Sequence, residues 1–218
     1  MTTANVQIYG PEFSNFVRSV SLICEENGIN YSSGWEINGE KVEYKSEEHI
    51  ALHPYGKMPV LVDGDTVIPE TTAICQYLLA KHTDENQFDL SDREFAQHNA
   101  FCAIVSIYID KAILRDYLLE FVFPKGEEGQ VRLDVVQANI PEVEKALEVV
   151  EHSLKTENFL NKEKLTIVDA LLAPILHYLS GLPAPFNIIS KYPVATAYLD
   201  KLMSRSSCQK LLTAKNLG

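Results

Sequence analysis

Two periodicities of hydrophobic and polar residues divide the first thirty positions of the chain. Val6 to Tyr9 is a short strand-like run that ends at Gly10-Pro11. The apolar positions from Phe16 to Cys24 then recur at helical spacing. Ser14 stands at the N-cap position of this helix and Gly28 just past its end. The pattern therefore predicts a strand followed by a helix.

The next fifty residues predict three further strands and a second helix. One strand falls within residues 29–37, and residues 40–48 are expected to form a loop. Val60 to Val62 and Thr66 to Ile68 flank Asp63-Gly64-Asp65 as a hairpin, and residues 70–81 are helical in pattern. The resulting order is βαβ–ββα, which is the order of a thioredoxin-like α/β domain.

The remainder of the chain is helical in pattern. Residues 82–87 are polar and lack periodicity, which predicts a domain linker at residues 82–91 between domains at 1–81 and 92–218. Periodic segments at residues 91–121, 135–154, 166–179 and 193–203 predict an all-α second domain. Thr166 and Asp169 have the spacing of a capping box, with Leu165 as its apolar staple. We interpret this box as a helix-initiation signal and not as part of a catalytic site.

Composition narrows the range of partners and locations. The formal net charge of −11 argues against nucleic acid and against anionic membrane surfaces, because both require clustered Lys and Arg. Residues 1–7 lack the basic start and the apolar run of a signal peptide. No stretch approaches the roughly 20 apolar residues of a membrane span. These features predict a cytoplasmic protein.

Cysteine and histidine spacing does not indicate a metal or a disulfide. The four cysteines are widely spaced and include no Cys-x-x-Cys pair, so we expect buried, reduced thiols. His49 and His53 stand four residues apart, but a metal needs three or four ligands, and Pro54 ends any helix there. We therefore expect no metal site.

One segment carries a resemblance to a known family. His53-Pro54-Tyr55-Gly56-Lys57-Met58-Pro59-Val60-Leu61, followed by Pro69-Glu70-Thr71, resembles the Asn-Pro-x-Gly-x-x-Pro-x-Leu segment and the Glu-Ser or Glu-Thr pair of cytosolic glutathione S-transferases. His53 replaces the usual Asn. The resemblance extends over nearly the whole chain. It implies a thioredoxin-like glutathione-binding domain, an all-α domain that contributes the acceptor site, and a homodimer. It also implies glutathione as a co-substrate, without a cofactor, and an electrophilic, mostly apolar small molecule as the acceptor.

The resemblance also suggests a catalytic hydroxyl. Residues 8–18, Ile-Tyr-Gly-Pro-Glu-Phe-Ser-Asn-Phe-Val-Arg, resemble the serine-type classes, and most closely the phi class, in which a Ser after the aromatic-Gly pair activates glutathione. That Ser corresponds to Ser14. By spacing alone Ser14 is an ordinary N-cap, although an anion is also favoured at a helix N-terminus. Tyr9 is the alternative, because other classes use a Tyr near the end of the first strand.

The same comparison places the binding residues. The Met58–Pro59 bond is expected to be cis, with the Met58 main chain pairing with the cysteinyl unit of glutathione. Lys57 lies beside the tripeptide and Lys45 near its glycine carboxylate, while Glu70 and Thr71 bind the γ-glutamyl ammonium and carboxylate. The acceptor pocket is assigned to Phe13, Phe101, Val105, Tyr108 and Ile109, although such a stripe is also typical of plain core. A non-catalytic binding or assembly module, and a peroxidase, isomerase or dehalogenase acting at the same site, remain alternatives.

Overall fold

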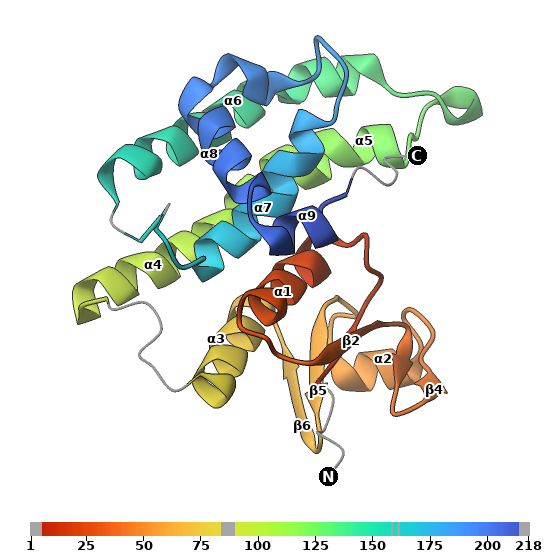
Figure 1. The fold of residues 1–218 in the computed structure, drawn as a ribbon. Coiled ribbons are helices and arrows are strands. Elements are labelled where there is room, and N and C mark those ends of the chain that lie inside the picture. Colours follow the sequence, from red (N-terminus) through yellow and green to blue (C-terminus); the bar gives the residue numbers. More distant parts are fainter. Residues whose placement is uncertain (1–5, 84–89, 158, 161, 214–218) are drawn as a thin grey trace. The chain divides into compact units, whose positions relative to one another are not determined.

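The computed structural model describes residues 6–83, 90–157, 159–160 and 162–213. The chain divides into two compact units, residues 1–89 and 90–218. In Figure 1 the first unit runs from red to gold and the second from yellow-green to blue. The linker predicted at residues 82–91 stays a prediction, and residues 84–89 of it lie outside the described residues.

The first unit is built on a four-stranded sheet in the order β2-β1-β5-β6. Strand β1 (Val6–Tyr9) is parallel to β2 (Tyr31–Gly34) and antiparallel to β5 (Val60–Asp63), which pairs with β6 (Thr66–Pro69). Helix α1 (Asn15–Glu26) connects the two parallel strands. The predicted βαβ–ββα order is thus confirmed, and the fold is thioredoxin-like.

Helices lie on both sides of this sheet (Figure 1). Helix α3 (Thr71–His82) follows the β5–β6 hairpin and packs against α1. Figure 1 shows α2 (Glu47–Leu52) on the other side of the sheet from α1 and α3. The expectation of a loop at residues 40–48 was wrong, because a short hairpin of β3 (Glu36–Ile37) and β4 (Glu40–Lys41) reaches into it and α2 begins within it. A helix of six residues is too short to show a clear apolar period.

Gly10 allows the end of β1 to approach two other segments closely. Its φ is +134°, a conformation that L side chains rarely adopt. A Cβ at this position would stand 2.7 Å from Val17 Cγ2 in α1 and 3.2 Å from Met58 Cβ. The start of α1 and the segment before β5 are therefore held against the end of β1.

Replacing Gly10 by Ala is expected to destabilise the protein by about 1 to 3 kcal/mol through backbone strain, with a further loss from the clash with Val17. Gly28 provides the matched control, because its φ is +62° but no heavy atom of the described residues lies within 4 Å of its Cβ position. Urea denaturation of both variants measures the difference. Equal losses in Gly10→Ala and Gly28→Ala would contradict the close packing at Gly10.

The second unit consists of helices in its described residues. Helix α4 (Asp92–Ile104) continues into a π-helical segment η1 (Val105–Leu118) and then into α5 (Leu119–Val122). Helices α6 (Leu133–Thr156), α7 (Ile167–Ser180), α8 (Pro193–Met203) and α9 (Ser206–Leu211) follow, with 3₁₀ turns η2 (Glu127–Gly129) and η3 (Ile188–Lys191). The predicted all-α domain is confirmed. No helix in the described ranges has the length and apolar character needed to cross a membrane.

Helix α7 is almost wholly buried, and it begins at the predicted capping box. The Asp169 N–H donates to Thr166 Oγ1 at 3.3 Å, and the Thr166 N–H donates to Asp169 Oδ2 at 2.8 Å. The Tyr198 hydroxyl of α8 donates to the other oxygen, Asp169 Oδ1. The box is confirmed, and the added tyrosine bond joins the start of α7 to α8.

Asp169→Ala is expected to lower the melting temperature by several degrees, because it removes a cap worth about 0.5 to 2 kcal/mol and leaves the buried Tyr198 hydroxyl without this acceptor. Ser91 and Glu94 form a second capping box at the start of α4, at a more exposed position. Glu94→Ala is therefore the control, and calorimetric scans should show a smaller loss for it. A loss in Asp169→Ala no larger than in Glu94→Ala would contradict the account of the buried box.

Candidate functional site

Ser14 stands at the N-cap of α1, and its hydroxyl makes no capping hydrogen bond within the described part of the chain. Its backbone is extended (φ −65°, ψ 129°), and its N–H donates to the Pro11 carbonyl at 2.9 Å. The hydroxyls of Thr166, Ser46 and Ser91 all accept capping hydrogen bonds, whereas the Ser14 hydroxyl makes none to the described residues of its helix. The hydroxyl is therefore available to a ligand at the helix N-terminus.

A side chain of α1, that of Arg18, holds the turn that carries Ser14. Nε of Arg18 donates to the Glu12 carbonyl at 2.9 Å, and the Arg18 N–H donates to the Ser14 carbonyl at 2.9 Å. Arg18 is buried despite its charge. Phe13, one residue before Ser14, is by contrast 59% exposed.

Tyr9, the alternative catalytic residue, is part of the core. Its side chain is fully buried, and its hydroxyl donates to the Val42 carbonyl at 3.2 Å. The ring contacts Trp35 and His49, with ring centroids 5.5 and 4.6 Å away. Burial raises the pKa of Tyr9, with Glu43 as a smaller cause. These surroundings are typical of a structural tyrosine.

The segment before β5 has the predicted geometry. The Met58–Pro59 peptide bond is cis, as the resemblance implied. Met58 is half-buried and lies against the end of β1 at Gly10, whereas the preceding Lys57 is exposed. Ser14 and Met58 thus both lie near the end of β1.

Glu70 and Thr71 begin α3 in an unusual conformation. Glu70 has φ +72° and ψ 115°, and its side chain is 77% exposed. A non-Gly residue in such a region costs about 1 to 3 kcal/mol, and such residues cluster at active sites, ligand clamps and switch regions. Nε2 of the buried His53 lies 3.5 Å from Glu70 Oε1, and His53 Nδ1 accepts the Tyr55 N–H at 3.2 Å. His53 therefore faces the carboxylate that the sequence assigned to the ligand.

Lys45 shares this strain, and a second histidine contacts its backbone. Lys45 has φ +64°, so two of the four non-Gly residues with positive φ in the described ranges belong to the predicted binding set. The Lys45 N–H lies 2.9 Å from His49 Nδ1, and the Lys57 carbonyl lies 2.9 Å from His49 Nε2. Residue spacing did not predict these backbone contacts of His49, and the described residues contain no cluster that could hold a metal ion.

The predicted acceptor residues occupy different surroundings. Phe101 is buried, with its ring centroid 5.9 Å from that of Phe159, and Val105 is fully buried. Tyr108 and Ile109 instead border a cavity of about 440 Å³ that is lined by residues of α4, η1 and α6. Tyr108 is 67% exposed. Phe101 and Val105 thus have the surroundings of core residues, which was the alternative for this stripe.

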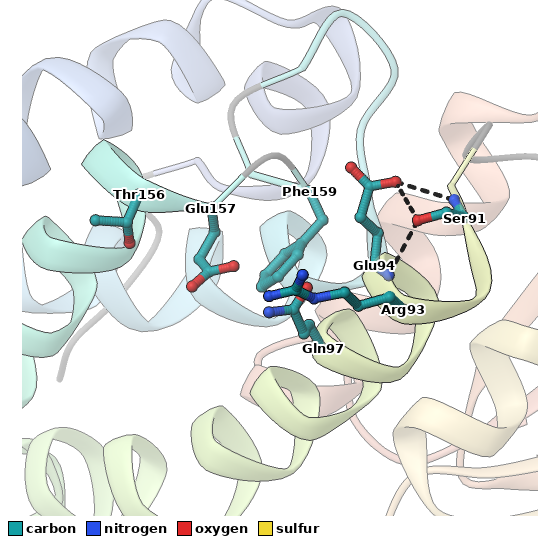
Figure 2. A pocket seen from close by; sticks show the side chains of 7 residues that line it. All are labelled: Ser91, Arg93, Glu94, Gln97, Thr156, Glu157 and Phe159. Atoms are coloured by element: carbon teal, nitrogen blue, oxygen red, sulfur yellow. Dashed lines mark hydrogen bonds between the residues drawn. The ribbon is translucent and has the colours of Figure 1, made fainter.

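A second cavity, of about 550 Å³, lies between the start of α4 and the end of α6. Figure 2 shows Arg93 and Gln97 extending from α4 toward Phe159, with the Ser91–Glu94 capping box at one side. Thr156 and Glu157 also line this cavity. The lining combines both signs of charge, and none of the predicted site residues borders this cavity.

Comparisons with known proteins identify the family to which this chain is similar. The model of the glutathione S-transferase N-terminal domain matches residues 8–86, and that of the C-terminal domain matches residues 112–206. A probable glutathione S-transferase of Oryza sativa subsp. japonica is 28% identical over 94% of this chain and 94% of that protein. Glutathione S-transferase F6 of Arabidopsis thaliana is 26% identical over 96% of this chain and 100% of that protein.

Solved structures extend the similarity to the fold. The structure of maize glutathione S-transferase I in complex with an atrazine glutathione conjugate has a TM-score of 0.79 and 26% sequence identity to this chain. The match covers 96% of this chain and 97% of that one. Because family models match both units and full-length relatives of the plant, phi-like type match the whole, this chain belongs to the glutathione S-transferase superfamily.

Proposed function

We propose that this enzyme activates the thiol of glutathione through the Ser14 hydroxyl and transfers the resulting thiolate to an electrophilic small molecule. The observation that carries this assignment is the Ser14 hydroxyl, which stands at the N-terminus of α1 without a capping hydrogen bond from the described part of that helix. The burial of Tyr9 and its bond to Val42 support Ser14 over Tyr9.

The energies available at this position are sufficient. Lowering a thiol pKa of about 8.5 by about two units requires roughly 2.7 kcal/mol of preference for the thiolate. A hydrogen bond to a charged group contributes about 1.5 to 3 kcal/mol, and a helix N-terminus contributes about 0.3 to 1 kcal/mol. A donated Ser14 hydrogen bond at the start of α1 thus accounts for the activation.

The remaining contacts orient the tripeptide. The Met58 main chain pairs with the cysteinyl unit, next to the cis bond to Pro59. Glu70 binds the γ-glutamyl ammonium, and Thr71 with the first N–H groups of α3 binds its carboxylate. Lys45 and Lys57 are both exposed and supply positive charge for the glycine carboxylate. The strained backbones of Lys45 and Glu70 support this placement.

The reaction itself is a nucleophilic attack. The thiol proton passes to solvent, and the thiolate sulfur forms a bond to an electrophilic carbon, whose leaving group departs with its electron pair. The residues proposed from the resemblance to contact an apolar acceptor are Phe13, Phe101, Val105, Tyr108 and Ile109. Of these, Tyr108 and Ile109 border a cavity, which supports their inclusion most directly.

Ser14→Ala is expected to raise the pKa of bound glutathione toward its free value and to lower the conjugation rate near neutral pH by about 10²-fold. Glutathione affinity should change much less, because the lost hydrogen bond is made to the thiolate. Ultraviolet titration of the thiolate in the binary complex measures the shift directly.

Tyr9→Phe is the parallel variant, and it should leave the thiolate signal in place. If Tyr9→Phe abolished that signal while Ser14→Ala retained it, Ser14 would be a helix cap only and the serine-type mechanism would be wrong.

Glu70→Ala is expected to weaken glutathione binding by about 2 kcal/mol, because it removes a charge-assisted hydrogen bond to the ligand. The fold should be retained, since the Glu70 side chain is exposed. Asp65→Ala, a change to an exposed carboxylate in the nearby hairpin turn, is the control and should leave affinity unchanged. Isothermal calorimetry with glutathione decides the matter, and an unaltered affinity in Glu70→Ala would exclude Glu70 from the site.

Activity assays distinguish conjugation from the other functions that the same site could support. Retention on immobilised glutathione without turnover would indicate a binding module, and turnover of peroxides, isomerisable substrates or organohalides would indicate peroxidase, isomerase or dehalogenase chemistry. A homodimer and activity without a cofactor are further proposals that rest on the resemblance, and a cytoplasmic location is a further proposal that rests on the sequence features described above. Light scattering of the purified protein tests the homodimer.

A further inference from the structure

His49 is a buried side chain with both ring nitrogens in use. It lies in α2, is fully buried, and contacts the rings of Tyr9 and Tyr44 at 4.6 and 5.5 Å between centroids. Its two nitrogens face the Lys45 N–H and the Lys57 carbonyl, each at 2.9 Å. The ring therefore joins two backbone segments that flank α2.

The identity of these partners fixes the state of the ring. A backbone N–H only donates and a carbonyl oxygen only accepts. Nδ1 must therefore be the unprotonated acceptor and Nε2 the N–H donor, which makes His49 a neutral imidazole with its proton on Nε2. The ring serves as a two-ended connector between Lys45 and Lys57.

The segments that His49 joins are the two lysine segments of the proposed glutathione site. Lys45 is held at φ +64°, where an L residue is unfavourable without support. A Cβ on Gly56, the residue before Lys57, would stand 3.6 Å from Lys45 Cγ, so the two segments lie close together. The Ser46 hydroxyl accepts the His49 N–H at 3.3 Å and sets the start of α2. His49 thus sets the spacing between the backbones of Lys45 and Lys57.

We propose that His49 is a positioning residue, which fixes Lys45 and Lys57 at the separation needed for both ammonium groups to bind the glycine carboxylate of glutathione. This inference rests on the proposed function, since it deepens the same site. It predicts that His49 contributes to selectivity for that carboxylate and contributes little to the reaction of the thiol.

The test compares His49→Phe with the wild-type protein. Phe retains a ring between Tyr9 and Tyr44 and removes both hydrogen bonds. We expect about tenfold weaker glutathione binding, the scale of one or two ordinary hydrogen bonds, with kcat changed by less than about twofold. His98→Phe, which replaces another buried histidine that contacts an aromatic ring in the second unit, is the matched control and should leave glutathione affinity unchanged.

Glutathione with an esterified glycine carboxylate provides the readout that a purely structural role would not move. The wild-type protein should bind free glutathione about tenfold more tightly than the ester, whereas His49→Phe should bind the two about equally. In a Lys45→Ala/Lys57→Ala background, adding His49→Phe should have almost no further effect, because residues that act as one unit are not additive. His49→Gln, which keeps a donor and an acceptor, should restore part of the preference and also serves if the Phe variant does not fold.

Each result has a defined meaning. A wild-type protein without preference for the free carboxylate would overturn the role of His49, as would full additivity with the lysine variants. So would an unchanged preference in folded His49→Phe or, if that variant does not fold, in His49→Gln. The outcomes that decide the role of His49 are measured by binding and do not depend on kcat. Glutathione binding with no turnover in the wild-type protein would therefore reject the catalytic proposal and leave this inference intact, whereas no binding at all would reject both.

Discussion

The close approach at Gly10 is the constraint on which the proposed site depends. A side chain at this position would overlap Val17 and press on Met58, so only the bare backbone lets β1, α1 and the cis-proline segment meet. Ser14 follows Gly10 by one short turn, and Met58 lies directly against Gly10. The residue proposed to act on the thiol and the residue proposed to bind its main chain are thereby positioned from one point of the sheet.

The second feature of the proposed site is a strained backbone at two residues that carry its charged side chains. Lys45 and Glu70 both have positive φ, and a buried histidine of α2 or its C-cap lies beside each of them. A conformation that costs about 1 to 3 kcal/mol persists only where its surroundings determine it. Holding these side chains before the ligand arrives reduces the ordering cost of binding. The stability lost to this strain is offset by the packing of fully buried residues such as Tyr9 and Val60.

The sequence was informative where the signal is local. The strand and helix order of the first unit, the cis Met58–Pro59 bond implied by the resemblance, and the Thr166–Asp169 box could all be predicted, because each depends on a few neighbouring residues. The short helix α2 and the π-helical stretch of η1 could not, because a six-residue helix has too little periodicity and a π-helix differs from an α-helix only in its hydrogen bonds. The connection from His49 to Lys57 depends on tertiary structure, so residue spacing could not predict it. The burial of Tyr9 supports the proposed assignment of Ser14, a choice that spacing alone left open.

A crystal structure of the protein with glutathione tests the central claim most directly. We predict that the sulfur lies within hydrogen-bond distance of Ser14 Oγ, that the cysteinyl main chain pairs with Met58, and that the γ-glutamyl ammonium contacts Glu70. The glycine carboxylate should lie between the ammonium groups of Lys45 and Lys57. A tripeptide bound away from these residues, or one whose sulfur is directed away from Ser14, would contradict the account.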